Sequence, residues 1–274
     1  MRGKVLLERE WSVADTDTGI TMHSEWMELL GERRWWPSRG QLSVGLRRFY
    51  QIKRNDTDCH ENPSLWGMKA VFQAKKCMWQ LAPEVEVPAL EELSVCVRLC
   101  LTLRTKWTAF AYKAPGISFV ELGLEGDSGH ITALLFGYKW PLDVMLSSHH
   151  WHSVCLTWSA RSQKLRVYVN GTSHLDLRLN PSVSRRLAPN GTLTLGVPHS
   201  VDESGAVRRE DGRSLMGDIG LFRMWAIAWR AEDLAHLGCE EGDVVRWDTR
   251  HWSYHYPSSC PPKADQTLRC GESF

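Results

Sequence analysis

The chain has 274 residues, and its 33 lysines and arginines nearly balance its 32 aspartates and glutamates, for a net charge of +1. This balance excludes a polybasic nucleic-acid-binding protein, and no apolar run reaches the length of about 18 residues that a membrane-spanning helix needs. Eight cysteines require an explanation, because a domain of this size builds its core without disulfides. They favour an oxidising, extracellular compartment over the alternative, a cytosolic protein with free, buried thiols.

The first 63 residues differ in character from the rest of the chain. Between Glu32 and Arg54 basic residues dominate, no regular periodicity persists, and Trp35-Trp36-Pro37 interrupts any element that begins. We therefore expect residues 1–63 to form a poorly structured basic leader. Residues 1–10 lack the apolar stretch of a secretory signal, so we expect the export signal of an extracellular domain to lie upstream of this sequence.

From residue 64 onward the sequence has the pattern of a β-protein. The longest predicted strand is Leu93–Leu101, an apolar and partly alternating run. Asn170-Gly171 supplies two positive-φ residues for a tight hairpin turn. Shorter strands are predicted over residues 118–124, 131–138, 153–158, 164–169, 174–179 and 192–195.

One short helix is predicted over Ala231–Leu237, with acidic residues in its first turn and Gly238 at its end. Many short strands with hairpin turns and a single helix are typical of antiparallel sandwiches. The sequence therefore predicts an all-β fold, a two-sheet antiparallel jelly-roll sandwich with one short helix near the C-terminal end.

Several blocks of sequence resemble the pentraxin domain when they are taken in order. They are Val95–Val97, Cys155–Trp158, Val167–Gly171 and Ser214–Gly220 through Trp225. The resemblance covers about residues 66–250, although Ser153 stands where the pentraxin pattern has a histidine, a departure that resembles the laminin-G pattern. The closest similarity that we infer is to the amino-terminal ectodomain of adhesion G-protein-coupled receptors, particularly subfamily D. We expect a pentraxin-like domain over residues 64–255 and a cysteine-bearing tail over residues 256–274.

The pentraxin resemblance implies a disulfide between Cys96 and Cys155. Cys100 would share a strand face with Cys96 at about 13 Å, which is too far for the two to be bonded to each other. The six remaining cysteines allow about fifteen pairings. We favour Cys77 with Cys239, and Cys260 with Cys270.

Pentraxins bind calcium, and the resemblance indicates where its ligands would lie in this chain. The acidic cluster that follows Leu-Gly in the family is replaced after Leu195-Gly196 by Val197, Pro198 and His199, and the family's glutamine before the Ser-Leu-Val-Gly-Asp motif is Arg213. The acidic residues that could rebuild an oxygen site are Asp202, Glu203, Glu210 and Asp211. Arginines are interleaved with these acids, so we favour a solvated mixed-charge loop and expect no cofactor.

Two other kinds of site are less well supported. Glu121 and Glu125 are the nearest pair to a glycosidase's carboxylates, but four residues along a strand separate them by about 13 Å, beyond the spacing such enzymes use. His149, His150 and His152 form a histidine cluster, yet only the last two would share a strand face, which leaves a metal site short of ligands.

The fourteen tryptophans divide between core and surface positions. Trp158, Trp225 and Trp247 occupy positions that the pentraxin pattern fills with core aromatics. Trp107, Trp140 and Trp151 fall near predicted loop ends, where an exposed ring could stack on a sugar or anchor a partner, although core packing is favoured for them as well.

The resemblance implies a non-catalytic extracellular recognition or adhesion module, part of the ectodomain of an adhesion receptor, with a protein or glycan partner at the cell surface. One alternative is a calcium-dependent, secreted, pentraxin-like pattern-recognition protein that forms homo-oligomers, and a second is a glycoside hydrolase of the jelly-roll group. Three sequons agree with an extracellular location and predict glycosylation at Asn55, Asn170 and Asn190.

Overall fold

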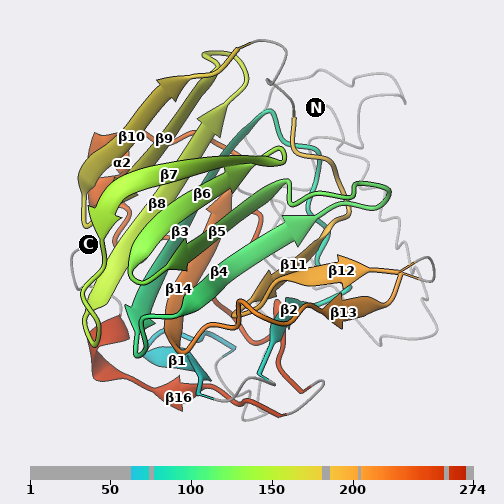
Figure 1. The fold of residues 1–274 in the computed structure, drawn as a ribbon, viewed down its shortest axis with the longest axis vertical. Helices are drawn as coiled ribbons and strands as arrows, with labels where there is room; N and C mark the ends of the chain where they lie inside the picture. The colour runs from blue at the N-terminus through green and yellow to red at the C-terminus, as the bar shows by residue number, and fades with distance from the viewer. Residues whose placement is uncertain (1–62, 74–76, 181–185, 203–204, 256–258, 270–274) are drawn as a thin grey trace, which may run out of the picture. The chain divides into compact units, whose positions relative to one another are not determined.

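The computed structural model describes residues 63–73, 77–180, 186–202, 205–255 and 259–269. These residues form a two-layer antiparallel β-sandwich, which confirms the predicted fold (Figure 1). The expected basic leader and Asn55 lie outside the described residues. No helix in the described ranges is both long enough and apolar enough to cross a membrane.

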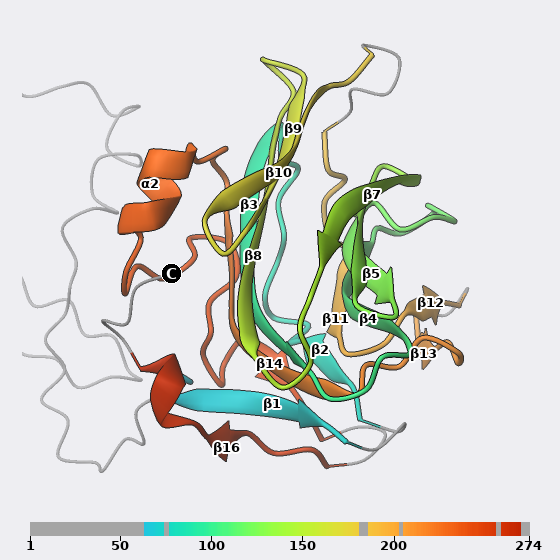
Figure 2. The same cartoon turned by 60° about the vertical axis from the view of Figure 1, so that its left-hand side comes forward.

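The first sheet has seven strands in the order β10-β9-β8-β3-β14-β1-β16. Figure 2 shows it as one layer of the sandwich, with the helix α2 on its outer side. Its strands are β1 (Met68–Phe72), β3 (Glu92–Leu101), β8 (Trp151–Ser159), β9 (Lys164–Val169), β10 (Thr172–Arg178), β14 (Gly217–Trp225) and β16 (Lys263–Ala264).

The second sheet also has seven strands, in the order β15-β2-β11-β4-β5-β6-β7, and a separate hairpin joins β12 to β13. Its strands are β2 (Trp79–Leu81), β4 (Lys106–Lys113), β5 (Leu122–Asp127), β6 (His130–Leu135), β7 (Tyr138–Met145), β11 (Thr192–Leu195) and β15 (Trp252–Ser253). The small hairpin comprises β12 (His199–Val201) and β13 (Val207–Arg209), and the helical segments among the described residues are α2 (Ala231–His236) and η3 (Gln266–Leu268).

The core lies between the two sheets, where large rings from both layers meet. Phe110 of β4 packs edge to face with Phe222 of β14, and Phe136 does the same with Trp158 of β8. A bulge between Thr108 and Phe110 lets β4 turn both Phe110 and Trp107 inward, although they are three residues apart. Trp107 is therefore 1% exposed.

Local turn chemistry explains two further features of the strands. Asn170 and Gly171 have φ values of 49° and 77° and join β9 to β10, as the sequence predicts. The run predicted as one strand over residues 131–138 is instead a hairpin, because Phe136 and Gly137 take φ values of 52° and 82° and reverse the chain between β6 and β7.

The disulfides confirm one of our predicted pairs and correct two others. Cys96 on β3 is bonded to Cys155 on β8, its direct cross-strand partner. Cys77 is bonded to Cys260, so the predicted Cys77–Cys239 and Cys260–Cys270 pairs are wrong. The physical reason is that β15 pairs with β2, which carries the residues after β15 back to the start of β2.

The other described cysteines are Cys239 and Cys100. Cys239 is also disulfide-bonded, to a residue other than Cys77. Cys100 is a free, half-buried thiol, and burial raises its pKa.

The C-terminal segment packs on the sandwich wherever the structure describes it. β16 pairs with β1, and Leu268 is fully buried against Gly220 of β14. Lys69 of β1 forms ion pairs with Asp218 at 2.8 Å and with Asp265 at 3.2 Å. The residues around β16 and η3 are thus an integral part of the domain.

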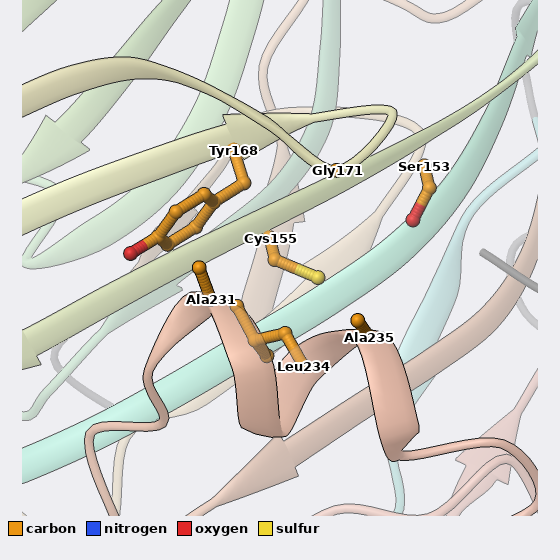
Figure 3. Close-up of a pocket in the computed structure, with 7 residues that line it drawn as sticks. All are labelled: Ser153, Cys155, Tyr168, Gly171, Ala231, Leu234 and Ala235. Atoms are coloured by element: carbon orange, nitrogen blue, oxygen red, sulfur yellow. The ribbon is translucent and has the colours of Figure 1, made fainter.

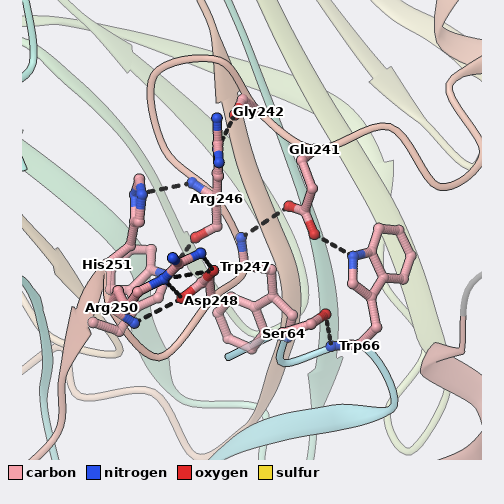
Figure 4. Close-up of polar contacts among 10 residues, drawn as sticks. Ser64, Trp66, Glu241, Gly242, Arg246, Trp247, Asp248, Arg250 and His251 are labelled. Atoms are coloured by element: carbon pink, nitrogen blue, oxygen red, sulfur yellow. Dashed lines mark hydrogen bonds and ion pairs between the residues drawn. The ribbon is translucent and has the colours of Figure 1, made fainter. Parts of the chain in front are cut away.

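A polar network fastens the start of the domain to the segment after β14 (Figure 4). The carboxylate of Glu241 accepts hydrogen bonds from the Trp66 indole and from the Trp247 backbone N–H. Asp248 is paired with Arg250 at 2.6 Å. Burial would raise the pKa of Asp248, but the hydrogen bonds from Arg250 outweigh it and lower that pKa.

Candidate ligand-binding face

The segment between β11 and β14 carries the acidic residues that the sequence singles out. It leaves the sheet at Gly196, where an added Cβ would lie 2.2 Å from the Phe72 ring and φ is +83°. It returns at Leu215, whose backbone N–H donates to the Gly196 carbonyl. The intervening hairpin β12–β13 therefore extends from two fixed points, and we call the surface of residues 198–202 and 205–213 with Lys113, Glu125 and Lys139 the loop face.

Each described acid of the hairpin has a cation beside it. Asp202 accepts from Arg208 at 3.0 Å, and Asp211 accepts from Arg209 at 3.0 Å. Glu210 lies 3.4 Å from Lys113, at the end of β4. Glu203 lies outside the described residues. The acids are therefore compensated within the chain instead of converging on one point.

A second ion cluster lies on the same face and joins β5, β7 and the segment before β14. Glu125 of β5 is 7% exposed, 2.7 Å from Lys139 of β7 and 3.5 Å from Arg213. Arg213 also donates to the Gly126 carbonyl at 3.4 Å. Arg213 thus holds its guanidinium against a buried carboxylate, and two cations satisfy that carboxylate.

His199 lies in the segment after Leu195-Gly196, where the pentraxin resemblance implies acidic residues. It is fully buried, and its Nδ1 lies 2.8 Å from the hydroxyl of Thr194. That hydroxyl donates its one hydrogen to the Val197 carbonyl at 2.9 Å, so Nδ1 must be the protonated nitrogen of His199. Burial, and secondarily the charge of Lys113, lowers the pKa of His199 to about 4. The imidazole is therefore neutral at physiological pH.

These residues do not fit the calcium of pentraxins. Calcium requires about six to eight oxygen ligands that converge on one point. Here each described acid is engaged by arginine or lysine, and Lys113 and Arg213 bring positive charge next to Glu210 and Glu125. Among the described residues, no group of three or more histidine, cysteine, aspartate or glutamate side chains is arranged to hold a metal ion.

The carboxylates considered for hydrolysis are both buried, and each has its own partner. Glu121 lies just before β5 and accepts a hydrogen bond from the Ala188 backbone at 3.3 Å. Glu125 is held by Lys139 and Arg213. The two carboxylates therefore bind different partners: Glu121 binds a backbone amide, and Glu125 binds two cationic side chains.

The histidine cluster is divided among structural contacts. His150 is exposed and its Nδ1 contacts the carbonyl of Ser148, while His152 is almost buried and contacts the Ser147 carbonyl and the Asn170 side chain. His149 is exposed in a turn with φ of 60°. The imidazoles of His150 and His152 thus contact the junction between β7 and β8.

The tryptophans predicted as core residues are buried, since Trp158 and Trp247 are fully buried and Trp225 is 2% exposed. Trp107 joins them because of the β4 bulge. Trp140 and Trp151 remain half-buried, and Trp140 lies beside exposed Tyr138 on the edge strand β7. Sequence reasoning missed Tyr138, whose position at an edge follows only from the strand order.

A small pocket lies under α2 on the outer side of the first sheet (Figure 3). Its floor is Cys155 and Tyr168, and its helical wall is Ala231, Leu234 and Ala235. Buried side chains beneath the helix form a second, minor core around the Cys96–Cys155 disulfide. The disulfide therefore supports α2 as well as joining two strands.

Two seven-stranded antiparallel sheets with one helix on an outer face define a pentraxin-type jelly roll. The sequence pattern of the Pentaxin family matches residues 72–257, more than half of the chain. The chain therefore belongs to the pentaxin family.

Its curated relatives include receptors and pentraxins. The chain is 27% identical to human adhesion G-protein coupled receptor G4 over 190 residues, and 30% identical to the mouse receptor over 191 residues. Each match covers 67% of this chain but only 6% of the receptor. Mouse neuronal pentraxin-2 is 25% identical over 158 residues, which are 54% of this chain and 36% of that protein.

Solved structures share the fold. A native heptameric SAP-like pentraxin from Limulus polyphemus has a TM-score of 0.62 at 16% identity, covering 74% of this chain and 98% of its own. The full extracellular region of zebrafish Gpr126/Adgrg6 has a TM-score of 0.59 at 22% identity. That match covers 76% of this chain and 28% of the zebrafish chain. The matched adhesion receptors are thus named as members of group G, whereas the sequence pattern suggested subfamily D.

Proposed function

We propose that this chain is a non-catalytic extracellular recognition module that binds a protein or glycan ligand at the cell surface without calcium. The observation that carries the proposal is the loop face, where each described acid is neutralised by a lysine or arginine of the same chain. Two disulfides and the family membership support an extracellular location. The receptor relatives support a place in the ectodomain of an adhesion receptor.

Calcium titration tests this proposal by thermal unfolding. If the chain bound calcium with a Kd of about 10 μM, 1 mM calcium would add about 2.7 kcal/mol of stability. For a domain of this size that gain raises Tm by roughly 5–10 °C. We expect the same Tm in 1 mM calcium and in a chelator. A rise in Tm that disappears in the Glu210→Ala variant would contradict the proposal.

Ligand capture supplies the second arm of the test. We expect the fluorescently labelled chain to bind ligand-bearing cells or an immobilised glycan panel equally in calcium and in chelator, and to lose binding when Lys113 and Arg213 are both replaced by glutamine. The exposed Arg178 on β10, replaced in the same way, is the matched control. Capture that requires calcium, together with a ring-sized mass in solution, would instead support the secreted, oligomeric pentraxin.

A further inference from the structure

The chain contains the same tripeptide, Asn-Gly-Thr, at two turns that the structure describes. Asn170 and Asn190 both adopt the left-handed conformation, with φ values of 49° and 58°, and both are exposed. Sequence and backbone conformation therefore do not distinguish the two asparagines. Their side chains do.

The carboxamide of Asn170 is used inside the fold. Its Oδ1 accepts from the Ser153 backbone N–H at 2.9 Å, and its Nδ2 lies 3.1 Å from Nδ1 of His152. Both partners belong to β8, the neighbour of the hairpin that Asn170 closes. Asn170 is thus a structural link between the turn and the sheet.

The carboxamide of Asn190 has no hydrogen-bond partner among the described residues, although its backbone is firmly held. Its N–H donates to the Val87 carbonyl at 2.9 Å. The next residue, Gly191, donates to the Tyr112 hydroxyl at 2.8 Å, and that hydroxyl donates to Ala188 at 2.7 Å. An added Cβ on Gly191 would lie 2.3 Å from the Tyr112 ring, so only glycine fits there.

Asn190 lines an open groove between two segments that are distant in sequence. One wall comes from the segment before β3, with Glu86 and Pro88, and the other from the segments after β14, with Ala226, Asp243 and Val244. Carboxylates accept hydrogen bonds from sugar hydroxyls, and the proline and valine side chains offer apolar surface to a sugar ring. The groove thus combines an unused carboxamide with walls that suit a carbohydrate.

We propose that Asn190 carries an N-linked glycan whose first sugars lie in this groove. In the transfer, Nδ2 loses a proton and bonds to the anomeric carbon of an N-acetylglucosamine. The bond from that carbon to a polyisoprenyl diphosphate carrier breaks, and the diphosphate leaves with the electron pair. This inference rests on the proposed extracellular location, because the transfer occurs only in the secretory pathway.

The test uses the full chain secreted from mammalian cells with an added signal peptide. The signal directs the chain into the secretory pathway, so the result depends only on the modification of Asn190. We expect glycopeptide mass spectrometry to find a glycan on Asn190. Thr192→Ala, which keeps the Asn190-Gly191 turn, should remove one glycan from the intact mass, whereas Thr172→Ala, the same change in the other tripeptide, should leave Asn190 modified. Thr192→Val is the second variant should alanine prevent secretion.

Hydrogen exchange tests the place of the glycan. The Ala226 N–H donates to Asp243 in the groove wall at 2.8 Å. We expect this amide to exchange several-fold more slowly in the glycosylated chain than in Thr192→Ala, with the Ala160 amide, which bonds to Glu91, as an unaffected reference. An unmodified Asn190 in the secreted chain would overturn the inference. Equal exchange of the Ala226 amide in the glycosylated chain and in Thr192→Ala would overturn the placement of the glycan in the groove. Detection of the endogenous protein on the cell surface or in the medium tests the location separately.

Discussion

Acidification should weaken this fold through His199. The neutral imidazole is favoured in the folded state, because its pKa falls from 6.5 to about 4, mainly through burial. Between those two values the unfolded chain binds more protons than the folded chain, so stability is lost as the pH falls. At pH 5, which is 1.5 pH units below the unfolded pKa, the loss from this one group is about 2 kcal/mol.

Urea unfolding at pH 7.5, 6 and 5, followed by tryptophan fluorescence with the disulfides intact, measures this effect. The wild-type chain should lose about 2 kcal/mol more between pH 7.5 and 5 than a His199→Gln variant, which cannot be protonated there. The pKa of His251 is also lowered by burial, but its contribution is common to both proteins and cancels. Replacing the exposed His150 by glutamine should leave the wild-type difference unchanged. Equal losses in wild type and His199→Gln would refute the reasoning.

Two further perturbations act through long-range contacts. Replacing Cys77 and Cys260 by serine opens a link across 183 residues and should cost roughly 4–5 kcal/mol as an upper bound, seen as a lower urea midpoint. Gly126→Ala places a Cβ 2.3 Å from the Trp107 ring in a closely packed core, so we expect a loss of about 3 kcal/mol or more. Gly116→Ala meets no atom within 4 Å and should cost only about 1–2 kcal/mol for its positive φ, so equal Tm losses at both glycines would contradict the packing argument.

Features of the site that depend on neighbouring residues were readable in the sequence. The Asn170-Gly171 hairpin follows from two residues that tolerate positive φ, and α2 follows from its acidic first turn and final glycine. The presence of His199 and Arg213, where the pentraxin resemblance implies an acidic cluster and a glutamine, could also be read from the sequence. What the sequence could not supply is which acid meets which cation, because Lys113 and Glu210 are 97 residues apart.

Trp107 and the cysteines show the same limit in the fold. Trp107 precedes a bulge that no local pattern marks, and the bulge decides that its ring enters the core. The Cys77–Cys260 pair depends on β15 adding to β2, a pairing between short strands with little periodicity of their own. Two-residue and three-residue strands carry too few alternating positions to predict.

The sequence by itself determined the all-β class, since strand alternation and turn residues are local patterns, and the order of its blocks carried the resemblance to the pentraxin domain. Only the tertiary structure decided that the acids of the loop face are paired with Lys113, Arg208, Arg209 and Arg213, and that Asn170 and Asn190 differ. Identical tripeptides with similar backbone angles acquire different roles because hydrogen-bond partners come from other strands. Sheet order, which is a long-range property, brings those partners into reach.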